Sequence, residues 1–100
     1  MTARLVTWGP SAAADYYATL EFLTDRSPVA ARKFADTVHE TIAGLARRNT
    51  GRPGRVSGSF EKSIKRYSYV IAYMYDGEAL HILRIIHTAR DWPRGGWPKE

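Results

Sequence analysis

The chain has 100 residues, of which 44% are hydrophobic, and it carries a formal net charge of +5 at pH 7. This length supports one modest hydrophobic core, so we expect residues 1–100 to form a single domain. The absence of cysteine excludes disulfides, thiol catalysis and cysteine-bound metals. The N-terminal residues contain no long apolar run, so we expect no signal peptide, and no stretch approaches the roughly 20 apolar residues that span a bilayer. We therefore expect a soluble, cytoplasmic protein without membrane association.

The charge is unevenly distributed along the chain. Residues 1–45 carry four cations against five acids, a net charge of −1, whereas residues 46–100 carry eleven cations against five acids, a net charge of +6. A basic region of this kind attracts nucleic acid or an acidic protein segment, and it can equally be a solvated surface.

The N-terminal quarter predicts a strand followed by a helix. Residues 4–8 alternate in polarity, and Gly9-Pro10 would end that strand. From Ser11 to about Asp25, apolar residues recur at helical spacing, with Ser11 or Gly9 as the N-cap. The apolar positions of this helix are Ala13, Tyr16, Tyr17, Leu20 and Leu23.

A second helix begins at Ser27-Pro28, a capping residue followed by proline at the first helical position. Arg47 and Arg48 lie in its last turn, and Asn49 is expected as a left-handed cap. The sequence thus predicts two antiparallel helices joined by a short turn. One apolar stripe runs along the second helix: Ala31, Phe34, Ala35, Val38, Ile42, Leu45 and Ala46.

The C-terminal half predicts strands. Residues 50–54 form a loop rich in glycine and proline, and residues 55–57 and 60–66 are candidate strands around a turn at Gly58-Ser59. Residues 69–75 and 80–86 are joined by Asp76-Gly77-Glu78, a strong hairpin signal. The expected fold is α+β: an N-terminal strand, an antiparallel two-helix hairpin packed on one sheet face, then a mainly antiparallel sheet.

Arg84 interrupts the last strand. Strict alternation places it on one face with Leu80, Ile82 and Ile86, and places His81, Leu83, Ile85 and His87 on the other. Arg84 either has a structural role, in which it extends to solvent at the sheet rim or pairs with a carboxylate such as Asp15, or it lines a concave anion site. His81 and His87 lie about 20 Å apart at strand rise, too far to share one ion. We expect no metal and no cofactor.

The whole chain resembles the ParE/RelE superfamily of bacterial type II toxins, and the ParE branch more closely. The most specific segments are Tyr69-Val-Ile-Ala-Tyr73 and the run from Ile82 to Pro93, Ile-Leu-Arg-Ile-Ile-His-Thr-Ala-Arg-Asp-Trp-Pro. Weaker segments support them: Ala12-Ala-Ala-Asp-Tyr16, Ser27-Pro-Val-Ala-Ala31, Leu45 and Gly51-Arg-Pro-Gly-Arg55.

This resemblance implies a cognate ParD-like antitoxin, whose extended acidic tail would lie on the basic half of this chain. The two proteins would form a toxin–antitoxin hetero-oligomer, and this complex would bind DNA only through the antitoxin. It also implies one of two actions. ParE-like members inhibit DNA gyrase, whereas RelE-like members cut mRNA on the ribosome without metal. RelE-like nucleases carry an arginine after the tyrosine that opens the central strand, and Val70 stands there in this chain.

We therefore expect a ParE-like toxin that inhibits gyrase by protein–protein contact, not an enzyme. The alternatives are a metal-free endoribonuclease and a non-toxic basic module that binds a partner. The residues expected to bind the target or the antitoxin are Arg55, Lys62, Arg84, His87, Arg90 and Trp92. The catalytic residues of a ribonuclease would be Lys62, Lys65, Arg84, His87 and Arg90.

Overall fold

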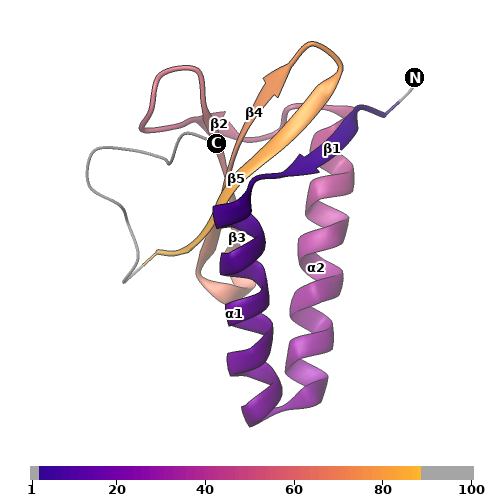
Figure 1. Cartoon of the computed structure of the whole chain (residues 1–100), viewed down its shortest axis with the longest axis vertical. Helices are drawn as coiled ribbons and strands as arrows, with labels where there is room; N and C mark the ends of the chain where they lie inside the picture. Colours follow the sequence, from indigo (N-terminus) through magenta and orange to yellow (C-terminus); the bar gives the residue numbers. More distant parts are fainter. Residues whose placement is uncertain (1–2, 89–100) are drawn as a thin grey trace.

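Two helices and a five-stranded sheet make up the fold, as the α+β prediction required (Figure 1). The structure, a computed structural model, describes residues 3–88, except for the side chain of Lys65. The elements are β1 (Leu5–Trp8), α1 (Pro10–Arg26), α2 (Pro28–Arg47), β2 (Arg52–Pro53), β3 (Phe60–Ile64), the 3-10 turn η1 (Lys65–Tyr67), β4 (Tyr69–Asp76) and β5 (Ala79–His87).

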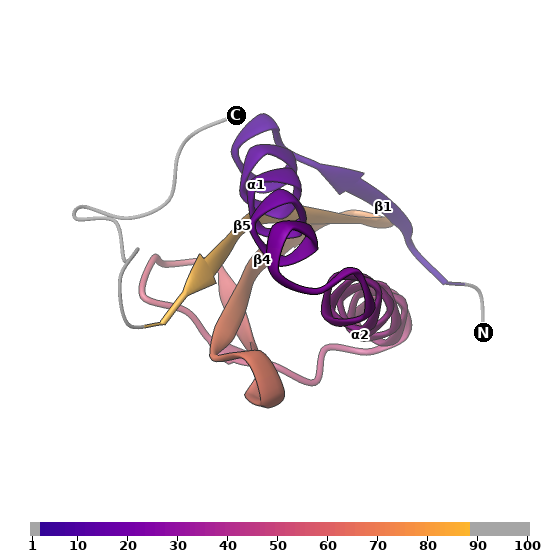
Figure 2. The same ribbon diagram turned by 90° about the horizontal axis from the view of Figure 1, so that it is seen from below.

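The sheet has the strand order β1-β5-β4-β3-β2. The first strand pairs in parallel with the last, and the other neighbours are antiparallel. Figure 2 shows the two helices nearly end-on and side by side. No helix in residues 3–88 is long and apolar enough to cross a membrane.

The helical hairpin forms as its capping residues predict. The Ser27 hydroxyl accepts a hydrogen bond from the Ala30 N–H (3.2 Å), which caps the start of α2. The Ser27 N–H donates to the Leu23 carbonyl (2.7 Å), the last such bond of α1. One residue thus ends the first helix and begins the second, which explains the short turn. Gly9 is the N-cap of α1, with Pro10 in the first turn.

The predicted cap at Asn49 is wrong. Arg48, in an extended conformation, ends α2, and among residues 3–88 the only non-glycine residue with positive φ is Ser68. The Asn49 side chain has another role, because its carbonyl oxygen accepts the Tyr73 hydroxyl (2.7 Å) and the Gly51 N–H (3.3 Å). These bonds join the end of α2 to the central strand.

The core lies between the helices and the sheet, and it contains the apolar stripe predicted for α2. Phe34, Val38 and Leu45 are fully buried there with Tyr73 and Ile82. In α1 the predicted Tyr16 is buried, and the predicted Leu20 and Leu23 pack against the core, whereas the other buried residues of this helix are Ala12 and Thr19. Tyr17, expected on the apolar face, is 67% exposed.

The strand predicted at residues 55–57 is also wrong. The first short strand after the helices is Arg52–Pro53, inside the segment expected to be a loop, and it pairs with Phe60 and Glu61. Proline is compatible with this position because β2 is an edge strand. The following strand ends at Ile64, earlier than the predicted Arg66, and the chain then turns through η1.

The β4–β5 hairpin forms as predicted, with Gly77 at φ +59° in the turn, a conformation that glycine adopts without strain. A β-bulge in β5 makes the predicted alternation wrong, because Tyr73 pairs with Ile82 but Ala72 pairs with Arg84. Leu80, Ile82 and Ile85 consequently share the core. His81 pairs with Met74, and His87 pairs with Tyr69. Because Met74 and Tyr69 point to different faces of β4, the bulge also places the two histidines on different faces of the sheet.

Candidate functional site

Arg84 and Asp15 form the strongest polar contact between the helices and the sheet. The guanidinium donates from Nε to Oδ2 (2.6 Å) and from Nη2 to Oδ1 (3.1 Å), a two-point ion pair. The two side chains are 19% and 18% exposed. The alternative in which Arg84 pairs with Asp15 is therefore confirmed.

Asp15 also completes the edge of β5. The first strand accompanies β5 only from Ala79 to Ile82, so the Ile85 N–H lies beyond its reach. That N–H donates to Asp15 Oδ2 (2.9 Å). A carboxylate from α1 thus occupies the place that a neighbouring strand would fill, and β5 can end without an unsatisfied donor there.

A second carboxylate organises the β2–β3 edge. Glu61 is 3% exposed and accepts the Arg55 N–H (3.0 Å) and the Arg52 guanidinium (3.2 Å). The Arg55 Nε lies 4.0 Å from the same carboxylate. The side chain of Arg52 is 56% exposed and that of Arg55 is 65% exposed. The buried acid therefore holds two cations at the surface.

The other predicted site residues have different surroundings. The Lys62 ammonium donates to the Thr50 carbonyl (3.3 Å), and the His87 ring packs edge-to-face on Tyr69 with centroids 5.1 Å apart. The side chain of Lys65 is outside the described part of the chain, as are Arg90 and Trp92 entirely.

These placements divide the predicted cations into groups. Lys62 lies with Arg52 and Glu61 at the β2–β3 edge, where the three line a pocket of about 220 Å³. Arg84, two strands away on β5, has its own partner on α1. Within residues 3–88, the cations are thus distributed over several sites.

Val70 occupies a buried position on the central strand. It is 1% exposed, and it pairs with Ser63 on β3 and with Ile86 on β5. Ile86 is also fully buried. This is the position where the RelE-like pattern has arginine. The chain therefore has an uncharged and solvent-inaccessible side chain at this position.

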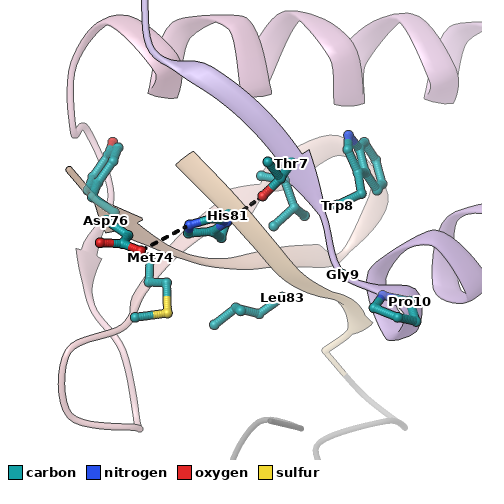
Figure 3. A pocket seen from close by; sticks show the side chains of 10 residues that line it. Thr7, Trp8, Gly9, Pro10, Met74, Asp76, His81 and Leu83 are labelled. Atoms are coloured by element: carbon teal, nitrogen blue, oxygen red, sulfur yellow. Dashed lines mark hydrogen bonds and ion pairs between the residues drawn. The ribbon is translucent and has the colours of Figure 1, made fainter. Parts of the chain in front are cut away.

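A pocket of about 540 Å³ lies where β1, β4 and β5 meet (Figure 3). His81 crosses it: Nδ1 is hydrogen-bonded with the Thr7 hydroxyl, and Nε2 lies 3.8 Å from Asp76 Oδ2. Met74 and Leu83 supply apolar walls, and the Trp8 ring points to the side away from them. The contacts of His81 with Thr7 and Asp76 were not predicted from the sequence. Thr7 reaches His81 because β1 pairs in parallel with β5, and this pairing has no local sequence pattern.

A second pocket, of about 400 Å³, lies between β1 and the two helices. Tyr16 is nearly buried at its base and donates to or accepts from His39 Nε2 (3.0 Å). Burial raises the pKa of the Tyr16 phenol, with smaller contributions from Tyr17 and Asp36. The aromatic lining was not predicted, because Tyr16 and Tyr17 both fit the expected core face.

The fold is that of small toxins from toxin–antitoxin systems. The structure of the chromosomal ParDE toxin–antitoxin system from P. aeruginosa contains a chain that superimposes with a TM-score of 0.75 at 25% identity, covering 85% of this chain and 96% of that one. A chain of the RelBE2 toxin–antitoxin complex from Mycobacterium tuberculosis gives a TM-score of 0.60 at 26% identity, with coverages of 87% and 93%.

A family model for the "ParE toxin of type II toxin-antitoxin system, parDE" matches residues 6–92. Because the match spans most of the sequence, the chain belongs to the ParE toxin family. A comparison with curated proteins found no match to this chain.

Proposed function

We propose that this ParE-family toxin inhibits DNA gyrase by protein–protein contact and is neutralised by a cognate ParD-like antitoxin. The observation that carries the proposal is the burial of Val70 at 1% exposure. Metal-free RNA cleavage needs a base, an acid and cations converging on one phosphate. A buried valine at the position of the RelE-like arginine removes one of those cations.

The partners of the remaining cations support the same proposal. Arg84 is neutralised by Asp15, whereas Arg52 and Arg55 share the single negative charge of Glu61. A cation already paired with a carboxylate stabilises the extra negative charge of a phosphorane less effectively than an unpaired one. Arg55 remains 65% exposed and Arg52 56%, so both can contact a macromolecule at the surface.

The antitoxin partner is supported by the charge distribution and by the complexes to which this fold is similar. Both neighbouring structures come from toxin–antitoxin systems. The net charge of +6 on residues 46–100 suits an acidic antitoxin segment. The toxin would then bind DNA only through its antitoxin, in a hetero-oligomer, with Arg55, Lys62, His87, Arg90 and Trp92 among the residues that contact its partners.

The direct test uses the purified full-length chain with DNA gyrase, relaxed plasmid and ATP. We expect supercoiling to fall and cleaved DNA to accumulate as toxin is added. The same amount of toxin mixed beforehand with antitoxin is the control and should leave supercoiling intact.

A parallel assay addresses the ribonuclease alternative, which the RelBE2-like fold keeps relevant. The chain is added to a translation extract supplied with purified mRNA, where gyrase has no role. Truncated mRNA together with unimpaired gyrase would overturn the proposal in favour of the nuclease. Unaffected gyrase and intact mRNA would instead favour a non-toxic module that only binds its partner.

One pair of variants tests the contact surface. Arg55→Ala removes an exposed cation whose Nε lies 4.0 Å from the Glu61 carboxylate, whereas Lys33→Ala removes an exposed cation from α2. We expect the first variant to weaken antitoxin or gyrase binding by about tenfold at low salt, and the second to have no effect. Arg84→Ala is a poor probe because it also breaks the ion pair with Asp15.

A further inference from the structure

The pocket between β1, α1 and α2 has the geometry of an aromatic box, defined by Trp8, Tyr16, Tyr17 and His39. Tyr16, which is 8% exposed, is the floor. The other three rings stand at steep angles to it: Trp8 at 61°, Tyr17 at 68° and His39 at 76°, with centroids 5.2, 5.4 and 5.6 Å from that of Tyr16. Steep walls around a flat floor leave an open space of about 400 Å³.

The box is built on rigid elements. Trp8 ends β1, Tyr16 and Tyr17 lie on α1, and His39 lies on α2. The hydrogen bond between Tyr16 and His39 (3.0 Å) fixes the two helices relative to each other at the floor. Tyr17, on the outer side of the box, is 67% exposed. Its exposure leaves the mouth of the box accessible.

Negative charge lies on both helices that carry the box. On α2, Asp36 is close enough to Tyr16 to help raise the pKa of its phenol, after burial and Tyr17. On α1, Glu21 lies one turn beyond Tyr17. Residues 1–45 carry a net charge of −1, in a protein whose total is +5. The local field therefore favours a cation.

This chain already places cations on aromatic rings elsewhere. The Arg4 guanidinium lies 4.4 Å from the Tyr75 ring centroid, and that of Arg26 lies 3.6 Å from the Phe22 centroid. Neither of these two cations lies on a ring of the box. Aromatic faces attract cations within about 6 Å of their centroids.

We propose that the aromatic box binds a lysine or arginine side chain of a polypeptide partner. That this partner is the antitoxin rests on the proposed function, whereas the preference of the box for a cation does not. An antitoxin would then use two opposite charges: an acidic segment on the basic half of the toxin and a basic anchor in the box. Such complementarity fixes the orientation of a partner as well as its affinity.

The test uses two probes of equal shape, choline and its neutral isostere 3,3-dimethylbutan-1-ol. Each is titrated into the ¹⁵N-labelled full-length chain, and the indole N–H signal of Trp8 is followed by NMR after assignment with Trp8→Phe. We expect a saturable shift with choline and a dissociation constant about threefold lower than for the neutral probe. Equal or tighter binding of the neutral probe, or no saturable shift, would overturn the proposal.

Matched variants localise the effect. Tyr17→Leu removes an exposed wall of the box, and we expect it to abolish the preference for choline. Phe22→Leu removes an exposed aromatic residue of the same helix outside the box and should leave that preference unchanged. A Trp8 shift that depends on protein concentration without probe would make a second copy of this chain the occupant, contrary to the proposal. Gyrase and antitoxin are not used, so a failure here is distinct from a failure of the proposed function.

Discussion

Asp15 and Arg84, 69 residues apart in the sequence, fasten α1 to β5 through a two-point ion pair with a shortest distance of 2.6 Å. The same carboxylate accepts the Ile85 N–H, so it satisfies both a side chain and the edge of the sheet. Arg84 looked like a candidate for substrate binding in the sequence, and in the structure it also holds the helices on the sheet.

Asp15→Asn should destabilise the protein by about 2 kcal/mol, because it leaves the mostly buried Arg84 charge without its counter-ion. The measurement is urea unfolding followed by circular dichroism. Asp25→Asn, an exposed change on the same helix, is the matched control and should alter the free energy of unfolding by less than about 0.5 kcal/mol. Equal effects of the two changes would contradict a structural role for the ion pair.

Two glycine substitutions should act in opposite directions. A Cβ at Gly51 would collide with the Tyr73 hydroxyl and lie 2.5 Å from the Glu61 carbonyl oxygen, so Gly51→Ala should cost about 2 kcal/mol or more. A Cβ at Gly44, inside α2, meets nothing within 4 Å, so Gly44→Ala should stabilise the helix by roughly 0.5–1 kcal/mol. Thermal unfolding of both variants checks this pair, and a stable Gly51→Ala would disprove the close packing.

Tyr73 should make the stability depend on pH under alkaline conditions. Burial raises the pKa of its phenol to about 12, with a further contribution from Tyr75 and an opposing hydrogen bond from the Gly51 backbone. Because the pKa is higher in the folded state, the contribution is complete below pH 10 and is lost as the pH rises toward 12. The loss is at most about 1.4 kcal/mol per pH unit.

Tyr73→Phe isolates this effect, since Tyr16 and Tyr75, whose pKa values are also raised, remain in the variant. Between pH 10 and 12 its free energy of unfolding should fall less steeply than that of the unmodified chain. Absorbance of tyrosinate should show one fewer late-titrating group. Identical slopes for the two proteins would contradict the assignment to Tyr73.

Glu61→Gln should loosen the β2–β3 edge, because a neutral amide holds Arg52 and Arg55 less strongly than a buried carboxylate. We expect a loss of about 1–2 kcal/mol in stability and faster hydrogen exchange at the Arg55 N–H. Glu40→Gln, on the exposed face of α2, is the control. Unchanged exchange at Arg55 would show that this carboxylate does not order the loop.

The parts of the fold governed by local chemistry were predictable. Ser27 and Pro28 marked the helix junction, the apolar period of α2 marked its core face, and Asp76-Gly77 marked the hairpin. Each signal depends on residues only a few positions apart. The pairing of Arg84 with Asp15 was one of the alternatives, and it needed the structure to decide between them.

The failures lie where tertiary contacts override local patterns. The bulge after Ile82 shifts the faces of β5, and it is imposed by pairing with β4 and by the carboxylate at the edge. The short strand at Arg52–Pro53 pairs with β3, and its Arg52 also contacts Glu61, a partner nine residues away that a local pattern does not indicate. The aromatic box depends on the packing of three separate elements, which single-segment patterns do not encode.

The topology of plasmid DNA in living cells tests gyrase inhibition most directly. Expression of the chain is induced in bacteria that carry a reporter plasmid, and topoisomers are resolved on chloroquine gels alongside RNA from the same cells. We predict that the plasmid loses negative supercoils while mRNA remains intact, and that co-expressed antitoxin prevents the loss. Normally supercoiled plasmid with cleaved mRNA would contradict inhibition of gyrase by contact.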